Sequence, residues 1–362
     1  MTPVDTDERP FVLIWEVTQA CELACEHCRA DATPDRHPDE LSTAQGKALL
    51  DDVRRFGDGQ LVVLSGGDPL AREDTVEFVD YGTDIGLRMT VTPSGTRSLS
   101  TGAVRALADA GVKQLAVSID GATPGSHDSF RGEAGSFEQT VRAARDAREA
   151  GVPLQVNTTV CAQTVDDLPA IRDLVRELDA VLWSVFFLVP VGRGRVLEPV
   201  SPERAERVMG FLDEVSREED FGVKTTEAPH FRRVQAQRAQ SRDGDGGPRR
   251  RGGITAGDGF AFVSHTGDVY PSGFLPESAG NVADDSIVDL YRDSDLFETL
   301  RRKDELTGKC GACEFRQVCG GSRSRAYAET GDPMGSDPLC EYVPEGYDGP
   351  LPERQASELA GD

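Results

Sequence analysis

The chain has 362 residues, of which 38% are hydrophobic, and its 63 acidic and 39 basic residues give a formal net charge of −24. This length suffices for one large α/β domain with a smaller appendage. So acidic a surface excludes nucleic acid and anionic membranes as general partners. No run of about 18 apolar residues predicts a membrane span, and the acidic start lacks the apolar core of a signal peptide. We therefore expect a cytoplasmic protein.

Strands and helices are predicted to alternate along the first 220 residues. Short apolar runs predict strands at 11–17, 60–64, 87–92, 113–119, 153–160 and 181–189. Apolar residues at helical spacing predict helices at 41–56, 72–85, 100–110, 136–150, 165–178 and 201–217. This alternation indicates a parallel sheet with helical crossovers. Six units are too few for a closed eight-unit barrel, so we predict an α/β fold, an open (βα)6 partial TIM barrel, with its chemistry at the carboxyl ends of the strands.

The predicted organisation has five parts. They are an N-terminal tail at 1–10, the partial barrel at 11–220, a bridging region at 221–305, a small cysteine-rich extension at 306–347 and a polar, disordered tail at 348–362. Within the bridging region, the glycine- and arginine-rich residues 241–259 predict a mobile loop. Residues 260–270 predict a small hairpin.

Cys21, Cys25 and Cys28 form a C-x3-C-x2-C run directly after the first predicted strand. Seven of the eight cysteines fall into two groups, which in a reducing compartment indicates metal binding rather than disulfides. Zinc and ordinary iron–sulfur sites use four protein ligands. Three thiolates on a four-iron cluster leave one iron open to bind a reactive molecule. A zinc site completed by His27 is the alternative, although a direct neighbour of Cys28 fits tetrahedral geometry poorly.

This loop resembles the signature of the radical SAM superfamily. The resemblance implies that the three cysteines hold a 4Fe–4S cluster, that the open iron binds S-adenosylmethionine, and that one electron splits this molecule into a 5′-deoxyadenosyl radical. Motifs at later strand ends match in order, namely Ser-Gly-Gly-Asp-Pro at 65–69, Pro-Ser-Gly-Thr at 93–96 and Ser-Ile-Asp-Gly at 118–121. The cofactor-binding residues so implied are Gly66, Gly67, Asp68, Ser94, Ser118, Asp120 and Asn157. Each one alone has an ordinary alternative as a turn or helix cap.

A second group of cysteines lies in the C-terminal extension. Its members are Cys310, Cys313, Cys319 and Cys340. The group resembles the SPASM/Twitch extension of radical SAM enzymes, which implies a second, auxiliary 4Fe–4S cluster, and a structural zinc site is the alternative. Ser322 stands where related sequences often have a cysteine, which leaves the ligand set open. The isolated Cys161 is predicted to be a buried small side chain.

Arginines form clusters in this acidic chain. Arg193 and Arg195 follow the sixth predicted strand, and others lie at 232–233, 249–251 and 323–325. Arginine binds carboxylates through two parallel hydrogen bonds, so a substrate with several carboxylates is one interpretation. Pairing with the protein's own acids is the other. The excess of acid with only five lysines is also typical of proteins from salt-loving organisms.

Several segments resemble the heme-biosynthesis branch of the superfamily, above all the AhbD-type heme synthase, an iron-coproporphyrin decarboxylase. They lie at 14–18, 25–30, 156–159, 187–194, 228–230, 264–267 and 308–314. The resemblance implies oxidation of two propionates of a tetrapyrrole to vinyl groups, with a ferredoxin or flavodoxin as electron donor. It makes His230 a candidate ligand of the substrate iron, with a surface or capping role as the alternative. Rival functions are a siroheme-derivative deacetylase, a ribosomal-peptide maturase and a non-enzymatic iron–sulfur scaffold or sensor.

Overall fold

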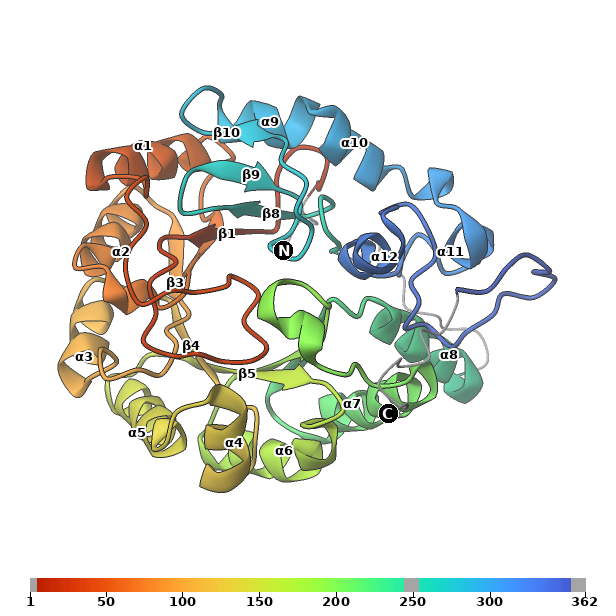
Figure 1. Ribbon diagram of the computed structural model, residues 1–362, viewed down its shortest axis with the longest axis horizontal. Coiled ribbons are helices and arrows are strands. Elements are labelled where there is room, and N and C mark those ends of the chain that lie inside the picture. Colours follow the sequence, from red (N-terminus) through yellow and green to blue (C-terminus); the bar gives the residue numbers. More distant parts are fainter. Residues whose placement is uncertain (1–4, 244–253, 353–362) are drawn as a thin grey trace.

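The computed structural model describes residues 5–243 and 254–352, and its strands form one curved ten-stranded sheet (Figure 1). The strands are β1 (Val12–Glu16), β2 (Leu61–Ser65), β3 (Arg88–Val91), β4 (Gln114–Ser118), β5 (Leu154–Val160), β6 (Leu182–Phe187), β7 (Gly222–Thr226), β8 (Phe260–Val263), β9 (Asp268–Tyr270) and β10 (Gly280–Asn281). Their order in the sheet is β10-β9-β8-β1-β2-β3-β4-β5-β6-β7. Strands β1 to β7 are parallel neighbours, which confirms the predicted open α/β barrel.

Helices α1 to α7 lie on the outer side of this sheet, and α11 and α12 lie toward its open side (Figure 1). The helices are α1 (Thr43–Arg54), α2 (Thr75–Asp84), α3 (Thr101–Asp109), α4 (Pro124–Arg131), α5 (Ser136–Glu149), α6 (Leu168–Glu177), α7 (Pro202–Glu218), α8 (His230–Asp243), α9 (Ile287–Asp293), α10 (Asp295–Arg301), α11 (Gly308–Ala312) and α12 (Arg323–Thr330). Single 3-10 turns occur at η1 (Pro69–Ala71), η2 (Val165–Asp167), η3 (Gly192–Val196) and η4 (Lys303–Glu305). No helix in the described part of the chain is long and apolar enough to cross a membrane.

Three of the six predicted helices begin at a serine that caps them. The Ser42 side chain accepts a hydrogen bond from the Gln45 N–H at α1, and Ser100 and Ser201 cap α3 and α7 in the same way. Serine oxygens satisfy backbone donors that the first helical turn leaves free. Helix α4 was not predicted, although Thr123 caps it and Pro124 opens it.

The sheet extends beyond the six predicted strands at both edges. Strand β7 pairs with β6, and its mixed sequence Gly-Val-Lys-Thr-Thr has no apolar run that would predict a strand. The predicted hairpin is confirmed as β8 and β9, but β8 also runs parallel to β1, in register from Val12 with Phe260 to Trp15 with Val263. The hairpin therefore belongs to the barrel sheet rather than to a bridge.

Part of the predicted mobile loop is ordered. The Phe11 N–H donates to the Gly259 carbonyl at 2.8 Å, so the end of this loop lines up β8 beside β1. Residues 244–253 of the predicted loop and residues 353–362 of the predicted tail lie outside the described residues.

The apolar core lies between the sheet and the outer helices. Trp15, Trp183 and Phe78 are fully buried there, and the Trp15 ring lies 4.8 Å from that of Phe78 on α2. Because successive strand residues point to opposite faces, the residues between these core positions face the inner side of the sheet. Those inner positions include Glu16, Ser65, Thr90, Ser118, Asn157, Ser184 and Lys224. The inner face therefore carries these polar side chains among apolar ones such as Ile14, Val63 and Phe186.

Candidate functional site

The loop between β1 and α1 carries the first group of cysteines. Cys21 and Cys25 are each 7% exposed in one buried patch, and Cys28 packs against the same patch. A hydrogen bond of 2.8 Å from the Cys21 N–H to the Thr33 carbonyl closes the loop, and all three cysteines are free thiols. The structure therefore gathers the three cysteines at the carboxyl end of β1.

Gly66 and Gly67 lie where the loop after β2 meets the cysteine loop. The Gly67 N–H donates to the Thr18 carbonyl at 2.8 Å. A Cβ on Gly66 would lie 2.5 Å from the Thr18 oxygen, and one on Gly67 would lie 2.5 Å from the Ala20 oxygen. Only glycine permits so close a backbone approach. Both glycines thus shape the backbone that leads into Cys21, and their predicted contact with the cofactor stays a prediction.

We expect Gly67→Ala to destabilise the protein by about 1–3 kcal/mol, because the added methyl group displaces the cysteine loop. Reconstituted protein should also retain less iron. Urea unfolding and iron analysis after desalting measure the two effects. Gly102→Ala on α3 is the matched control, since the nearest atom to its added Cβ is 3.7 Å away, and it should be neutral or stabilising by up to about 1 kcal/mol. Equal stability of the two variants would contradict the prediction.

Arg193 holds the cysteine loop from the opposite side. Its Nε donates to the Cys25 carbonyl at 3.0 Å, its Nη1 to the Ala32 carbonyl at 2.8 Å, and its backbone N–H to the Cys28 carbonyl at 3.0 Å. Two arms of this guanidinium therefore bind protein backbone, which neither of the two interpretations of the arginine clusters had foreseen. Arg195, its predicted companion, is exposed.

Burial dominates the chemistry of the thiols. It raises the pKa of Cys21 to about 11, and a neighbouring carboxylate, Asp68, adds to the increase. Burial also raises the pKa of Cys25, against the opposing charge of Arg131, whose Nη1 lies 3.9 Å from the Cys25 sulfur. Both thiols therefore keep their protons at neutral pH until a metal displaces them.

Asp120 and Arg131 form a buried ion pair next to the cysteine loop. Their exposures are 2% and 6%, and 3.6 Å separates Asp120 Oδ2 from Arg131 Nη1. Asp120 Oδ1 accepts the Thr159 N–H at 2.7 Å. Burial raises the pKa of Asp120, but the Arg131 guanidinium, together with the two neighbouring histidines and the Thr159 N–H, outweighs it and holds this pKa below its usual range. The carboxylate is therefore charged.

His27 faces this ion pair. Its Nε2 lies 3.2 Å from Arg131 Nη1, and its ring stacks on Phe130 at 4.4 Å. Burial lowers the pKa of His27 to about 4, so the ring is neutral and accepts the arginine N–H. The alternative of a zinc site at the first cysteine group required His27 as a ligand. The observed orientation of the His27 ring, toward Arg131, does not support that alternative.

Four buried polar atoms around the cysteine loop have no hydrogen-bond partner in the described structure. They are His27 Nδ1, Asp120 Oδ2, Arg131 Nε and Arg193 Nη2. Folded proteins satisfy nearly all buried polar groups, so this concentration indicates a site shaped for a polar ligand. The amino, carboxylate and ribose groups of S-adenosylmethionine supply partners of the required kinds.

Asp68 and Ser94 connect the loops after β2 and β3. Asp68 Oδ2 accepts hydrogen bonds from the hydroxyls of Thr96 and of Ser98, the latter at 2.8 Å. The Ser94 hydroxyl donates to the Gly67 carbonyl. Ser118 and Asn157, in turn, lie side by side in register on the inner face of β4 and β5. The structure therefore brings the predicted residues to one rim of the sheet.

One network at this rim was not predicted from the sequence. Glu16 ends β1 on the inner face, and its carboxylate contacts His265 Nδ1 at 2.9 Å and Arg29 Nη2 at 2.6 Å. The Arg29 guanidinium also lies 4.6 Å from the Phe262 ring centroid. These residues lie in segments that resemble the heme-biosynthesis branch, at 14–18, 25–30 and 264–267. Their contacts could not be predicted, because the segments are far apart in the sequence.

The second group of cysteines shares a single cavity. The cavity is small and opens to solvent, and Cys310, Cys313, Cys319 and Cys340 all line it. Three cations, Arg233, Lys309 and Arg316, line it as well. Burial raises the pKa of the Cys340 thiol to about 11. Arg233 and Arg316 also pair with Glu206 and Asp304, and Lys309 donates to the Cys340 carbonyl. Four thiols near positive side chains suit a metal group that is bound through thiolates.

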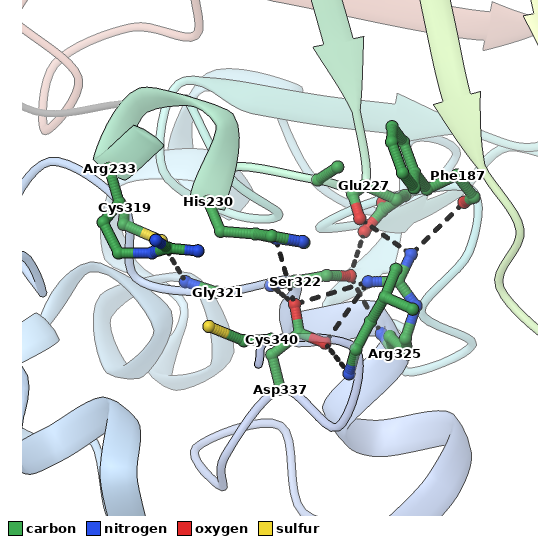
Figure 2. Close-up of polar contacts among 12 residues, drawn as sticks. Phe187, Glu227, His230, Arg233, Cys319, Gly321, Ser322, Arg325, Asp337 and Cys340 are labelled. Atoms are coloured by element: carbon green, nitrogen blue, oxygen red, sulfur yellow. Dashed lines mark hydrogen bonds and ion pairs between the residues drawn. The ribbon is translucent and has the colours of Figure 1, made fainter. Parts of the chain in front are cut away.

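A buried polar network connects this cavity to the barrel (Figure 2). Arg325 donates to the carbonyls of Leu188 at the end of β6 and of Glu227 after β7, and it pairs with Asp337 at 3.3 Å. The Ser322 N–H donates to Asp337 at 2.8 Å, and its hydroxyl donates to Glu227 at 2.5 Å. The Ser322 side chain thus faces the barrel. The Arg325 guanidinium is fully engaged with other groups of the protein.

His230 is buried in this network, at 0% exposure (Figure 2). Its Nδ1 lies 3.8 Å from Asp337 Oδ2, and burial lowers its pKa to about 3. The sequence had offered a surface or capping role, or a ligand of substrate iron. The buried position of His230 is against a surface role.

Arg233, an arginine that lines the cysteine cavity, binds the Glu206 carboxylate with two nitrogens, at 2.9 and 2.5 Å. For Arg233 and Arg325, pairing with the protein's own acids was therefore the better interpretation.

The zinc alternatives find no preformed ion site at either cysteine group. In residues 5–243 and 254–352, no three His, Cys, Asp or Glu side chains stand close enough to hold a metal ion. A four-iron cluster is larger than one ion and holds its cysteines further apart. The donor sets of both groups are thiols, which suit iron–sulfur clusters and, at the four-cysteine group, zinc as well.

Comparison with known proteins identifies the class. Residues 15–175 match the family model described as the radical SAM superfamily. The AdoMet-dependent heme synthase of Methanosarcina barkeri is 40% identical over 341 residues, which cover 92% of this chain and 97% of that protein. The chain belongs to the radical SAM superfamily and is an enzyme of this class, as the cysteine loop predicted.

Two further comparisons define its place in the superfamily. The Fe-coproporphyrin III synthase of the same organism is 29% identical, over 94% of this chain and 89% of that protein. Among solved structures, SuiB of Streptococcus suis bound to S-adenosylmethionine has a TM-score of 0.71 at 17% identity, over 92% of this chain and 78% of that one. The solved structure supports the fold, and the two relatives place this chain among enzymes of similar length.

Proposed function

We propose that this enzyme removes carbon dioxide from the propionate groups of iron-coproporphyrin III and leaves vinyl groups. The 40% identity to a heme synthase, over nearly the whole of both chains, carries the proposal. The lower identity to the Fe-coproporphyrin III synthase makes the deacetylase-type reaction the second choice. Polar side chains on the inner face of the sheet, at whose rim the cysteine loop lies, are compatible with a polar substrate.

In this proposal Cys21, Cys25 and Cys28 hold a 4Fe–4S cluster, which with S-adenosylmethionine supplies a 5′-deoxyadenosyl radical. That radical takes a hydrogen atom from the propionate carbon next to the ring. The C–C bond to the carboxylate then breaks, and the products are a vinyl group, carbon dioxide, 5′-deoxyadenosine and one electron. The protein contributes position: Arg193 and Gly67 hold the cysteine loop, and Asp120 presents a charged oxygen without a hydrogen bond beside it.

The proposal includes a SPASM/Twitch-type auxiliary cluster as acceptor of the released electron. Cys310, Cys313, Cys319 and Cys340 are its ligands, and their shared cavity with three cations supports this assignment. Positive neighbours raise the potential of an iron–sulfur cluster, which favours electron uptake. We further predict that a low-potential ferredoxin or flavodoxin donates the electron to the first cluster and that the enzyme is cytoplasmic.

One anaerobic experiment tests the reaction. Protein reconstituted with iron and sulfide is incubated with S-adenosylmethionine, dithionite and iron-coproporphyrin III, and the porphyrin is analysed by mass spectrometry. We expect loss of two carbon dioxide units with 5′-deoxyadenosine as co-product. An unchanged porphyrin alongside 5′-deoxyadenosine would refute the heme synthase assignment. Absence of 5′-deoxyadenosine would favour the scaffold or sensor alternative.

The auxiliary cluster has its own test. Cys319→Ala should lower bound iron from about eight atoms to about four, keep the cleavage of S-adenosylmethionine and stop porphyrin conversion. Cys161→Ala is the control, because Cys161 is fully buried outside both cysteine groups, and it should keep all the iron. Unchanged iron in Cys319→Ala would remove this residue from the ligand set.

A further inference from the structure

A row of four polar residues crosses the inner face of neighbouring strands. The register pairs Ser118 of β4 with Asn157 of β5, Asn157 with Ser184 of β6, and Ser184 with Lys224 of β7. Residues paired in this way point to the same face of a sheet. Their strand neighbours Val117, Val156, Trp183 and Val223 pack in the core on the outer side. The row therefore lies on the concave side, and its first two members are predicted cofactor residues.

Ser184, in the middle of the row, carries a hydroxyl that nothing in the described structure satisfies. It is 0% exposed, and its hydroxyl has no hydrogen-bond partner in the described structure. The neighbouring Asn157 oxygen accepts from the Gln155 amide at 2.6 Å. A buried hydroxyl without a partner is unfavourable and rare in folded proteins, so a polar ligand or a water that accompanies it explains Ser184.

Lys224 ends the row with an unusual positive charge. Among the five lysines, Lys47 pairs with Glu77 and Lys303 with Asp258. Lys309 donates to the Cys340 carbonyl, and Lys113 is exposed at the other end of the strands. No acidic side chain of residues 5–241 or 254–352 lies within ion-pair distance of Lys224, and burial alone lowers its pKa, to about 8. The side chain nevertheless remains accessible to solvent. An accessible cation without an acidic neighbour is suited to an anion from outside the chain.

We propose that Lys224 binds a propionate carboxylate of the tetrapyrrole and so positions the substrate along this row. The inference rests on the proposed function and adds a substrate-positioning residue to it. A lysine ammonium is a compact charge that pairs with a carboxylate without demanding a planar partner. The methionine carboxylate of S-adenosylmethionine has the same chemistry. The substrate is favoured because Lys224 lies on β7, the last strand, beyond the predicted cofactor residues on β2 to β5.

Two lysine variants of the reconstituted holoenzyme test the proposal. Lys224→Met removes the charge, and Lys113→Met is the matched control, because Lys113 is exposed before β4 at the opposite end of the strands. Absorbance titration measures the affinity for iron-coproporphyrin III, and calorimetry measures that for S-adenosylmethionine. We expect about tenfold weaker porphyrin binding in Lys224→Met, with wild-type affinity in Lys113→Met. Affinity for S-adenosylmethionine should stay unchanged in both, and Lys224→Arg should recover part of the porphyrin affinity.

Methylated porphyrin gives a second readout. The tetramethyl ester of iron-coproporphyrin III has no carboxylate, so wild type and Lys224→Met should bind it equally. Thermal melting establishes that Lys224→Met is folded, and Lys224→Gln replaces it if it is not.

The possible failures differ from one another. Equal binding of iron-coproporphyrin III by wild type and Lys224→Met would overturn the inference and leave the proposed function intact. Weaker binding of S-adenosylmethionine alone would assign Lys224 to the cofactor and overturn it as well. A wild-type holoenzyme that neither binds nor converts the porphyrin would refute the proposed function itself, and the inference with it.

Discussion

Cys25→Ala should abolish the formation of 5′-deoxyadenosine and reduce bound iron from about eight atoms to about four. Cys25 is central to the loop: its thiol lies in the buried patch with Cys21, its carbonyl accepts the Arg193 Nε–H at 3.0 Å, and its sulfur lies 3.9 Å from Arg131 Nη1. Two thiolates cannot replace three, and the buried patch offers no fourth thiol. Iron analysis and chromatographic detection of 5′-deoxyadenosine measure the loss.

Cys161→Ala serves as the control here too and should retain both iron and activity. Together with Cys319→Ala, the Cys25 variant separates the two groups. Each variant should lose one half of the iron, but only Cys25→Ala should lose cleavage of S-adenosylmethionine. Full iron content or residual cleavage in Cys25→Ala would contradict the ligand assignment.

Asp120→Asn should destabilise the protein by about 3–5 kcal/mol, because it leaves the Arg131 charge buried without its counter-charge. Both side chains are almost inaccessible, at 2% and 6% exposure, so solvent screens the pair little. Urea unfolding measures the change. Glu177→Gln is the control: its partner Arg145 and Glu177 itself are both more than half exposed, and its cost should stay below about 1 kcal/mol.

The cost of Asp120→Asn should depend on pH in a definite direction. Arg131 holds the pKa of Asp120 below its usual range, so folding favours the charged form. The stabilisation is complete above the unfolded pKa of about 4 and is lost as the pH falls through the lower folded value. Wild type and variant should therefore converge in stability at acid pH. A constant difference from pH 7 to pH 3 would contradict this explanation.

Much of the fold followed from local pattern. Apolar periodicity marked the six βα units, because burial on one face of a strand or helix constrains nearby residues only. Strand β7 and helix α4 escaped prediction for the same reason. Gly-Val-Lys-Thr-Thr gains its strand structure from pairing with β6, and nothing in its own composition requires it.

The sequence allowed us to predict which strand end each candidate residue lies at. Cys21, Cys25 and Cys28 follow β1, and in a parallel sheet all carboxyl ends meet at one rim. Their partners were not predictable. Arg193 binds the cysteine loop, and His230 is buried beside Asp337, because long side chains choose partners that lie close only after folding.

By itself, then, the sequence determined the class of enzyme, since the spacing of three cysteines after a strand is a local property that folding preserves. The tertiary structure alone decided which charges are free. It paired Arg233 and Arg325 with acids of the chain, placed Glu16 beside His265, and left Lys224 without an acid in the described part of the chain. Charge pairing depends on distances between segments far apart in the sequence, and only the packed sheet sets those distances.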